Sequence, residues 1–250
     1  MLSLTSQAGT RIRHDERMLR FMFVGDSMTI GSAGERTWRH HMWRHLRDTY
    51  GDDGFAVVGP RTALYDKTAG GPVSHDYADA SPDFPRHHLA GWGEGWLHMA
   101  PEIAGVLGRD PADVLLVSLG LIDLGFYTDA EQTADNVRAF VTRARTANPR
   151  IRMVLLPVIP NVRAETDAPF AAEVARFNEL LAKAVADLDT GASPLLLASR
   201  PDAYDIHADT YDGTHPNASG ERKLADAFAT AMAQAWGTPG PHGPTLVAAS

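Results

Sequence analysis

The sequence contains no cysteine among its 250 residues. Disulfides, thiolate metal ligands and a cysteine nucleophile are therefore excluded together. The sequence also has no apolar run near the ~20 residues that span a bilayer, and its first residues lack the ~7–15-residue apolar stretch of a secretory signal. These absences predict a cytoplasmic protein without a membrane partner.

Basic residues are fewer than acidic ones, with 23 Lys and Arg against 31 Asp and Glu, and the formal net charge is −8. Surfaces that bind nucleic acid or anionic lipid need clustered Lys and Arg. The composition therefore argues against nucleic acid and favours a small-molecule partner. It makes no prediction of the oligomeric state.

Short apolar runs alternate with longer segments that have helical spacing. The apolar runs, which predict buried strands, are Leu19–Val24, Phe55–Gly59, Val114–Leu119, Ile151–Ile159 and Pro194–Ala198. The segments with helical spacing include Thr37–Tyr50, Ala130–Ala147, Pro169–Leu188 and Ala218–Trp236. Because parallel strands need long and usually helical crossovers, this alternation predicts an α/β sandwich with a parallel sheet and helices on both faces.

The chain is predicted to form one domain over residues 19–236, preceded by an extension of residues 1–18. Residues 237–250 are dense in Pro and Gly and predict a flexible tail. The segment Arg61–Leu89 has no sustained periodicity and is too long for an ordinary connection. We expect it to shape a substrate pocket.

A serine follows the first predicted strand in the segment Gly25–Gly31, which reads GDSMTIG. A tight strand-to-helix turn directs backbone N–H groups outward, where they can stabilise an oxyanion. Ser27 is therefore a candidate nucleophile for attack on an acyl carbon. The alternative for an isolated triplet of this kind is that Ser27 caps a helix.

A serine hydroxyl needs a general base, usually a histidine that a carboxylate orients. The segment Tyr211–Asn217, which reads YDGTHPN, supplies both immediately before the last helix. A turn of three residues can bring the Asp212 carboxylate to the His215 imidazole. The prediction is a catalytic set of Ser27, His215 as base and Asp212 as its orienting group.

With these two blocks in this order, the chain resembles the SGNH, or GDSL-type, hydrolase superfamily from about Phe21 to Trp236. The resemblance implies a three-layer α/β/α sandwich with a five-stranded parallel, flavodoxin-like sheet. It also implies a serine-dependent ester hydrolase that acts on a small acyl ester or thioester through an acyl-enzyme intermediate. It implies no cofactor and no metal.

The resemblance further implies an oxyanion hole formed by the backbone N–H groups of Ser27 and of a glycine in the family's second block. Gly91 is the best match for that glycine, and Gly93 is its competitor. The family's third block, Gly-x-Asn-Asp, supplies an asparagine donor, but here residues 120–123 read GLID. Ile122 therefore replaces the asparagine, and loss of one oxyanion donor costs about 10²–10³ in turnover.

Asn161, which follows the fourth predicted strand, is one residue that could replace the missing donor. We therefore predict that Asn161 and Ile122 both contact the substrate. Asp26 and Asp123, which also follow strands, are predicted to accept backbone N–H bonds and to support the loops rather than to take part in the chemistry.

Other functions remain open at this level. An acyltransferase would share the acyl-enzyme step and differ only in the acceptor. Loss of the asparagine is also compatible with a non-catalytic protein that binds a small molecule. Finally, a carboxylate and imidazole cluster could hold a divalent metal; its members are Asp205, His207, Asp209, Asp212 and His215.

Overall fold

The computed structural model describes residues 18–78 and 81–241. It contains the five predicted strands, which are β1 (Leu19–Gly25), β2 (Phe55–Val57), β6 (Val114–Ser118), β7 (Arg152–Leu156) and β8 (Leu195–Leu197). They form a sheet in the order β2-β1-β6-β7-β8, and every neighbouring pair is parallel. This is the predicted flavodoxin-like order. Most of the predicted extension and tail, residues 1–17 and 242–250, lies outside the described residues.

A sixth strand adds to the predicted five. β5 (Leu89–Ala90) pairs in parallel with the end of β1, beyond the part of β1 that β2 covers. Two residues are too few to produce a recognisable pattern in the sequence. The pairing brings the residues that follow β5 next to the residues that follow β1.

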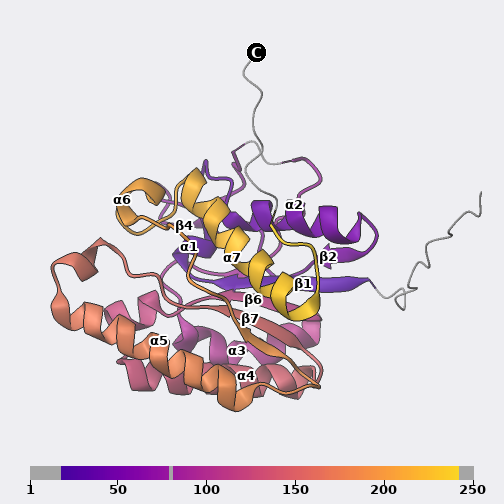
Figure 1. The fold of residues 1–250 in the computed structure, drawn as a ribbon. Helices are drawn as coiled ribbons and strands as arrows, with labels where there is room; N and C mark the ends of the chain where they lie inside the picture. The colour runs from indigo at the N-terminus through magenta and orange to yellow at the C-terminus, as the bar shows by residue number, and fades with distance from the viewer. Residues whose placement is uncertain (1–17, 79–80, 242–250) are drawn as a thin grey trace, which may run out of the picture.

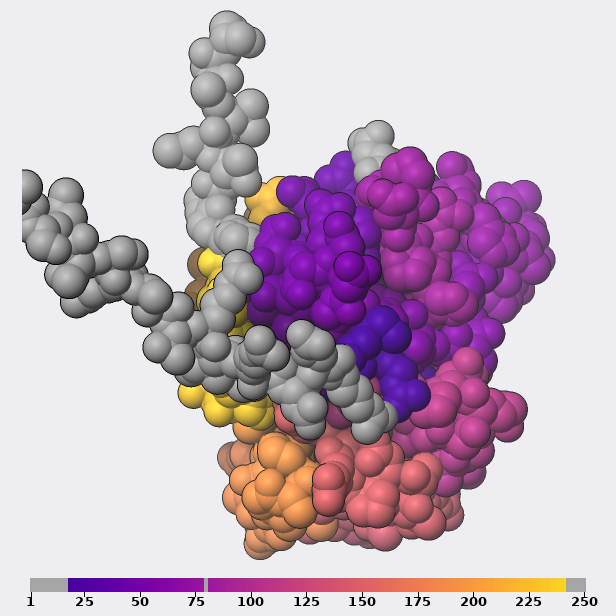
Figure 2. Space-filling model, turned by 90° about the vertical axis from the view of Figure 1, so that its right-hand side faces the viewer, coloured from indigo at the N-terminus to yellow at the C-terminus, as the bar shows by residue number. Residues whose placement is uncertain are grey.

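Helices cover both faces of the sheet (Figure 1). α2 (Trp38–Tyr50) and α7 (Ala218–Trp236) pack together on one face. α3 (Trp96–Arg109), α4 (Ala130–Ala147) and α5 (Ala168–Leu188) pack side by side on the other. The side view shows α4 and α5, in salmon and orange, well separated from the purple segments of the opposite layer (Figure 2). The three-layer sandwich is thus confirmed.

Alternate residues of β1 supply two separate hydrophobic cores. Phe21 and Phe23 point into the core beneath α2 and α7, whereas Met22 and Val24 point into the core beneath the other three helices. Trp38 is fully buried in the first core, where its ring stacks on that of Phe228 with centroids 4.8 Å apart. Burial of both faces explains why the strands are continuous apolar runs.

The segment predicted to shape a pocket forms a small hairpin against the nucleophile loop. Its strands are β3 (Leu64–Asp66) and β4 (Gly71–Ser74), which pair antiparallel. The Tyr65 N–H donates to the Gly31 carbonyl at 2.9 Å, and the Ala33 N–H donates to the Tyr65 carbonyl at 2.9 Å. The hairpin is therefore fixed to the loop that follows Ser27.

Four short helices complete the described fold. They are α1 (Ser27–Ile30), the π-helix η1 (Asp123–Tyr127), the 3₁₀-helix η2 (Val162–Glu165) and α6 (Ile206–Asp209). Three of them follow the ends of β1, β6 and β7, which is the edge where ligands bind in open α/β sheets. Within residues 18–78 and 81–241, no helix is both long and apolar enough to cross a bilayer.

The stacked pair Trp38 and Phe228 yields a stability prediction. Phe228→Ala should lower the free energy of unfolding by about 3–5 kcal/mol, because the fully buried ring leaves a cavity. Phe126→Ala is the matched control, since that ring is 77% exposed and its loss should cost little. Urea denaturation of both variants measures the difference, and equal losses would contradict the assignment of Phe228 to the core.

Candidate active site

The turn after β1 uses each residue of the Gly-Asp-Ser motif differently. A Cβ atom on Gly25 would overlap the Thr29 side chain and the Ser118 carbonyl, so only glycine fits. Asp26 is the N-cap of α1, and its carboxylate accepts the Met28 N–H at 3.0 Å. Ser27 is the first residue of the helix. The capping function considered for Ser27 therefore belongs to Asp26, and the serine hydroxyl is left for another partner.

That partner is His215, which lies 188 residues away in the sequence. The Ser27 Oγ atom is 3.0 Å from His215 Nε2. On the other side of the ring, His215 Nδ1 is 2.8 Å from Asp212 Oδ2. Because a carboxylate only accepts, Nδ1 carries the proton and Nε2 accepts from the serine hydroxyl. The three predicted residues thus form a continuous hydrogen-bonded line.

The turn from Asp212 to His215 fixes this orientation. The second carboxylate oxygen of Asp212 accepts the backbone N–H groups of Thr214 at 3.0 Å and His215 at 2.8 Å. Burial opposes ionisation of Asp212, but hydrogen bonds from the backbone and side chain of His215 outweigh it and lower the pKa of Asp212. The carboxylate therefore remains charged at neutral pH, as an orienting group must.

Aromatic rings that were not among the predicted site residues surround the base. The rings of Trp92 and Tyr211 stack on the His215 imidazole, and the ring of Tyr65 stacks on Trp92. Trp92 and Tyr211 directly adjoin predicted site residues in the sequence, and this adjacency could have identified them as part of the site. The ring of Tyr65 could not have been assigned, because only the fold of the hairpin brings it here.

Tyr211, whose ring stacks on His215, also borders a hollow of about 350 Å³. Most residues that line it are polar or charged; they are Ser32, Ala33, Glu35, Asp66, Lys67, Thr68 and Tyr211. Lys67 and Tyr211 are joined within it by a hydrogen bond of 3.3 Å. The hairpin thus contributes to a polar pocket. That this pocket binds the substrate stays a prediction.

Gly91 lies immediately after β5, close to the end of β1. Its N–H donates to the Gly25 carbonyl at 3.2 Å. To act as an oxyanion donor, the same N–H would also have to reach the substrate. A Cβ atom on Gly91 would meet the ends of the Arg61 and Glu94 side chains, which form an ion pair beside it. Gly93 has a φ of 75°, which explains that glycine by backbone conformation. The oxyanion role of Gly91 remains a prediction.

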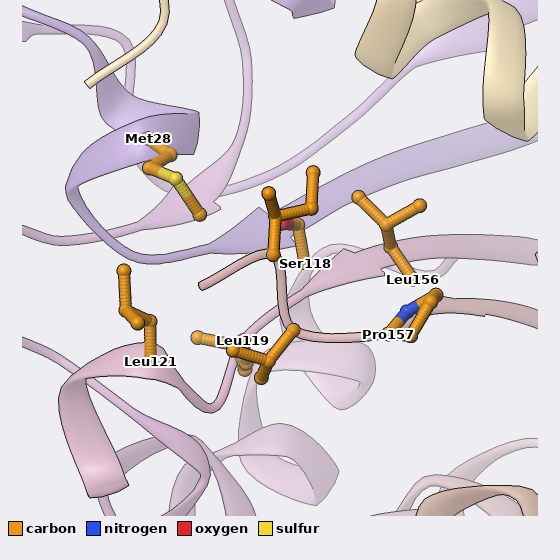
Figure 3. A pocket seen from close by; sticks show the side chains of 8 residues that line it. Met28, Ser118, Leu119, Leu121, Leu156 and Pro157 are labelled. Carbon is orange, nitrogen blue, oxygen red and sulfur yellow. The ribbon is translucent and has the colours of Figure 1, made fainter. Parts of the chain in front are cut away.

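Ile122 directly precedes η1 and is half-buried. Its neighbour Leu121 lines a cavity of about 10 Å³ that Met28 covers from the nucleophile helix. Met28 points from α1 toward Leu121 across this space (Figure 3). Such a volume holds about one water molecule. The space beside Leu121 is therefore small and lined mostly by apolar side chains.

Asn161 lies against the loop that carries the catalytic base. Its amide nitrogen donates to the Thr214 hydroxyl at 3.2 Å, and the Val162 N–H donates to the Gly213 carbonyl at 2.8 Å. The amide oxygen of Asn161 is buried and has no hydrogen-bond partner among the described residues. The structure thus brings Asn161 to the triad loop, and its contact with substrate stays a prediction.

Two buried carboxyl groups support the loops at the sheet edge. The Asp123 side chain accepts the N–H groups of Trp96 at 2.8 Å and Leu97 at 3.0 Å, at the start of α3. Burial raises the pKa of Asp26 to about 7, and the Asp123 carboxyl contributes in the same direction. Both residues accept backbone N–H groups, as predicted.

A fully buried arginine joins the nucleophile helix to the hairpin segment. Arg39 donates to the carbonyls of Thr29 at 2.8 Å and Ile30 at 3.0 Å, at the end of α1. It also donates to the Tyr77 hydroxyl at 2.9 Å and to the Arg86 carbonyl at 3.0 Å. A buried guanidinium is tolerated only when its donors are satisfied. Arg39 therefore fixes α1 relative to the segment that forms the hollow.

A second buried charge connects α7 to the loop after the nucleophile. The carboxylate of Glu221 accepts the Thr37 N–H at 2.9 Å. Thr37 has a φ of 72°, which is uncommon for a β-branched residue and requires support from its surroundings. Burial raises the pKa of Glu221 to about 7. Because α7 begins directly after the His215 loop, this contact ties the two halves of the triad together.

The carboxylate and imidazole cluster considered for a metal is dispersed in the structure. Asp209 pairs with Lys223 at 2.6 Å, and His207 pairs with Glu165 at 2.8 Å. Asp205 caps α6. Across residues 18–78 and 81–241, no group of three or more carboxylate and imidazole residues is arranged to hold a metal ion.

The fold and the serine–histidine–aspartate geometry define an SGNH-type hydrolase site. The model of the GDSL-like lipase/acylhydrolase family matches residues 23–223. The chain therefore belongs to that family. Both motifs on which the sequence resemblance rests fall within the matched region.

A curated relative shares little sequence identity with the chain but matches most of its length. A multidomain esterase of Ruminococcus flavefaciens is 23% identical over 229 residues, which cover 88% of this chain and 28% of the relative. The chain thus spans little more than a quarter of that protein.

Solved structures share the fold. A carbohydrate esterase family 3 structure from Talaromyces cellulolyticus has a TM-score of 0.72 at 22% identity, and covers 87% of this chain and 97% of its own. A family 3 carbohydrate esterase of Clostridium thermocellum has a TM-score of 0.68 at 17% identity, with coverage of 87% and 96%. Membership of the GDSL-like lipase/acylhydrolase family supports an enzyme of the hydrolase class, and the neighbours show the fold.

The buried carboxyl of Glu221 predicts a pH-dependent stability. Its pKa rises from 4.5 to about 7 on folding, so the folded state binds the proton more tightly, and stability falls as pH increases between these values. Glu221→Gln retains an acceptor for Thr37 but cannot ionise. As the pH rises from 5 to 8, the free energy of unfolding of the variant should increase by about 2–3 kcal/mol relative to that of the parent protein.

Chemical denaturation at several pH values measures this gain. Glu179→Gln is the control, because the Glu179 side chain is 74% exposed and should show no such trend. Parallel pH profiles for Glu221→Gln and the parent protein would contradict the raised pKa.

Proposed function

We propose that the protein is a serine-dependent esterase that removes a small acyl group from a carbohydrate-like alcohol through an acyl-enzyme intermediate. The observation that carries this proposal is the hydrogen-bonded line from Ser27 through His215 to Asp212. A serine in such a line is activated for nucleophilic attack. Membership of the GDSL-like acylhydrolase family supports the same class of reaction.

In the first half of the reaction, Ser27 Oγ attacks the ester carbonyl carbon. His215 Nε2 takes the hydroxyl proton, and Asp212 stabilises the imidazolium that forms. The carbonyl oxygen becomes an oxyanion, for which the backbone N–H groups of Ser27 and Gly91 are the proposed donors. Collapse of the tetrahedral intermediate breaks the ester bond, and His215 returns the proton to the departing alkoxide.

In the second half, water attacks the acyl-enzyme while His215 again acts as base. The carboxylic acid leaves, and the proton returns to Ser27. The exposure of the triad favours water over a bulky acceptor. The Asp212 side chain is 39% exposed and that of His215 is 15% exposed, so the base lies close to solvent. We therefore favour hydrolysis over acyl transfer.

The neighbouring space supports a small acyl group and a polar alcohol. The cavity beside Met28 holds only about 10 Å³ and offers no room for a long chain. The hollow of about 350 Å³ beside Tyr211 carries charged, hydroxyl and aromatic side chains, which suit a ring bearing several hydroxyls. Structural neighbours include proteins described as an acetyl esterase and an acetyl-xylooligosaccharide esterase. An acetylated sugar is accordingly the proposed substrate.

Labelling of the nucleophile tests the proposal directly. A fluorophosphonate probe should label the protein, and p-nitrophenyl acetate and acetylated xylooligosaccharides should be hydrolysed. Ser27→Ala should abolish labelling and lower turnover by several orders of magnitude, because the nucleophile is lost. Mass spectrometry of the labelled peptide and release of acetate are the measurements.

Ser219→Ala serves as the matched control, because Ser219 lies on α7 outside the triad. Labelling that survives Ser27→Ala would overturn the assignment of the nucleophile. A chelator is added in parallel, since chelator-sensitive turnover would instead favour the metal mechanism. A folded protein with neither labelling nor turnover would favour the non-catalytic binding function.

Replacement of Ile122 tests the oxyanion argument. Ile122→Asn supplies an amide donor at the position where the family has one, and should raise turnover of p-nitrophenyl acetate by up to about 10²-fold. Ile122→Leu provides no donor and should leave turnover within a few-fold of the parent enzyme. An unchanged or lower rate in Ile122→Asn would mean that the site has adapted around isoleucine.

A further inference from the structure

The imidazole of His215 lies nearly parallel to two aromatic rings. The centroid of the nearer Trp92 ring is 4.7 Å away, with an angle of 18° between the planes. The Tyr211 ring is 5.7 Å away, with an angle of 16°. Rotation of the imidazole about its side-chain bonds would drive it against these rings. Stacking therefore restricts the plane of the base in addition to its contacts with Ser27 and Asp212.

Separate contacts hold the two rings in place. Trp92 follows β5, which is paired with the end of β1, and its ring is backed by the Tyr65 ring at 4.4 Å. The hydroxyl of Tyr211 lies 3.1 Å from the Ser32 hydroxyl. Both rings are therefore connected to the strand and loop that carry the nucleophile. Tyr211 is 43% exposed and Trp92 is half-buried, so these contacts rather than burial hold the rings against His215.

The stacking also bears on the charge of His215 during the reaction. The imidazole becomes an imidazolium when it takes the Ser27 proton, and the face of an indole or phenol ring attracts a cation. We propose that Trp92 and Tyr211 are positioning residues that fix the plane of His215 and favour its protonated form. This inference rests on the proposed esterase function, in which His215 is the base.

Other charges near the base act alongside the rings. Asp212 faces Nδ1 and favours the imidazolium. Lys67 opposes it, because its ammonium lies 4.6 Å from the Tyr211 centroid and 5.9 Å from that of Trp92. Glu35 lies near the Tyr211 hydroxyl and partly offsets Lys67. The effect of the two rings on the charge of His215 therefore adds to the effects of Asp212, Lys67 and Glu35.

The direction in which the His215 pKa changes distinguishes this proposal from one in which Trp92 only excludes water from the site. If Trp92 only excludes water, Trp92→Leu would admit solvent and raise the His215 pKa, because hydration favours the charged form. If the ring stabilises the imidazolium, the same substitution lowers the His215 pKa by up to about one unit. NMR titration of the His215 ring in a Ser27→Ala background distinguishes the two outcomes.

Kinetics provide the second measurement. Trp92→Leu should reduce kcat for p-nitrophenyl acetate by about tenfold with little change in KM, and should shift the acidic limb of the kcat/KM profile downward. Trp92→Phe keeps a ring and should retain most of the parental activity and His215 pKa. Trp236→Leu is the control for loss of a tryptophan, since Trp236 lies at the end of α7 against Arg152.

An unchanged or raised His215 pKa in Trp92→Leu, with the thermal unfolding temperature preserved, would overturn the inference. The NMR titration needs no substrate. A protein that shows the expected titration shift but hydrolyses no ester would therefore refute the esterase function and leave the aromatic contact standing. Active enzyme without the shift would do the reverse.

Discussion

Parallel pairing around β1 brings the ends of several strands, and the residues that follow them, to one edge of the sheet. β1 pairs with β2, β5 and β6, and all three pairings run in the same direction. The carboxyl ends of these strands therefore meet at one edge, which is where open α/β sheets bind ligands. Ser27, Trp92 and Ile122 follow β1, β5 and β6 respectively and are brought to this edge, although almost a hundred residues separate the first from the last.

Buried polar groups hold this edge together, and each of those described above makes hydrogen bonds to the backbone. Asp26 and Asp123 accept N–H groups at the starts of α1 and α3, whereas Arg39 donates to carbonyls at the end of α1. Glu221 accepts the N–H of Thr37 and thereby joins α7 to the nucleophile side of the site. A buried charge without such partners would be strongly destabilising, so these contacts constrain the loops to a narrow set of geometries.

The site combines a hydrogen-bonded serine, histidine and aspartate with an isoleucine at the position where the family resemblance implies an asparagine. Ser27, His215 and Asp212 have the spacing expected of an activated serine, but Ile122 has no hydrogen bond to offer an oxyanion. In the proposed reaction, the aromatic rings stacked on His215 would act on the positive charge of the base rather than on the oxyanion. Stabilisation of that charge and stabilisation of the oxyanion each lower the activation barrier. A weaker oxyanion hole therefore leaves the effect on the base unchanged.

Apolar periodicity and two short motifs carry local information, and from them the sequence predicted the five strands, four long helices and the candidate set of Ser27, His215 and Asp212. The flavodoxin-like strand order was implied by the family resemblance. The same resemblance also exposed the replacement at residue 122. The tertiary structure was needed to show that β5 joins the sheet and that Asn161 contacts Thr214. It was also needed to place Tyr65, Lys67 and Arg39 near the site. These features depend on contacts between segments far apart in the chain, and no local pattern of residues specifies which distant partner a side chain will meet.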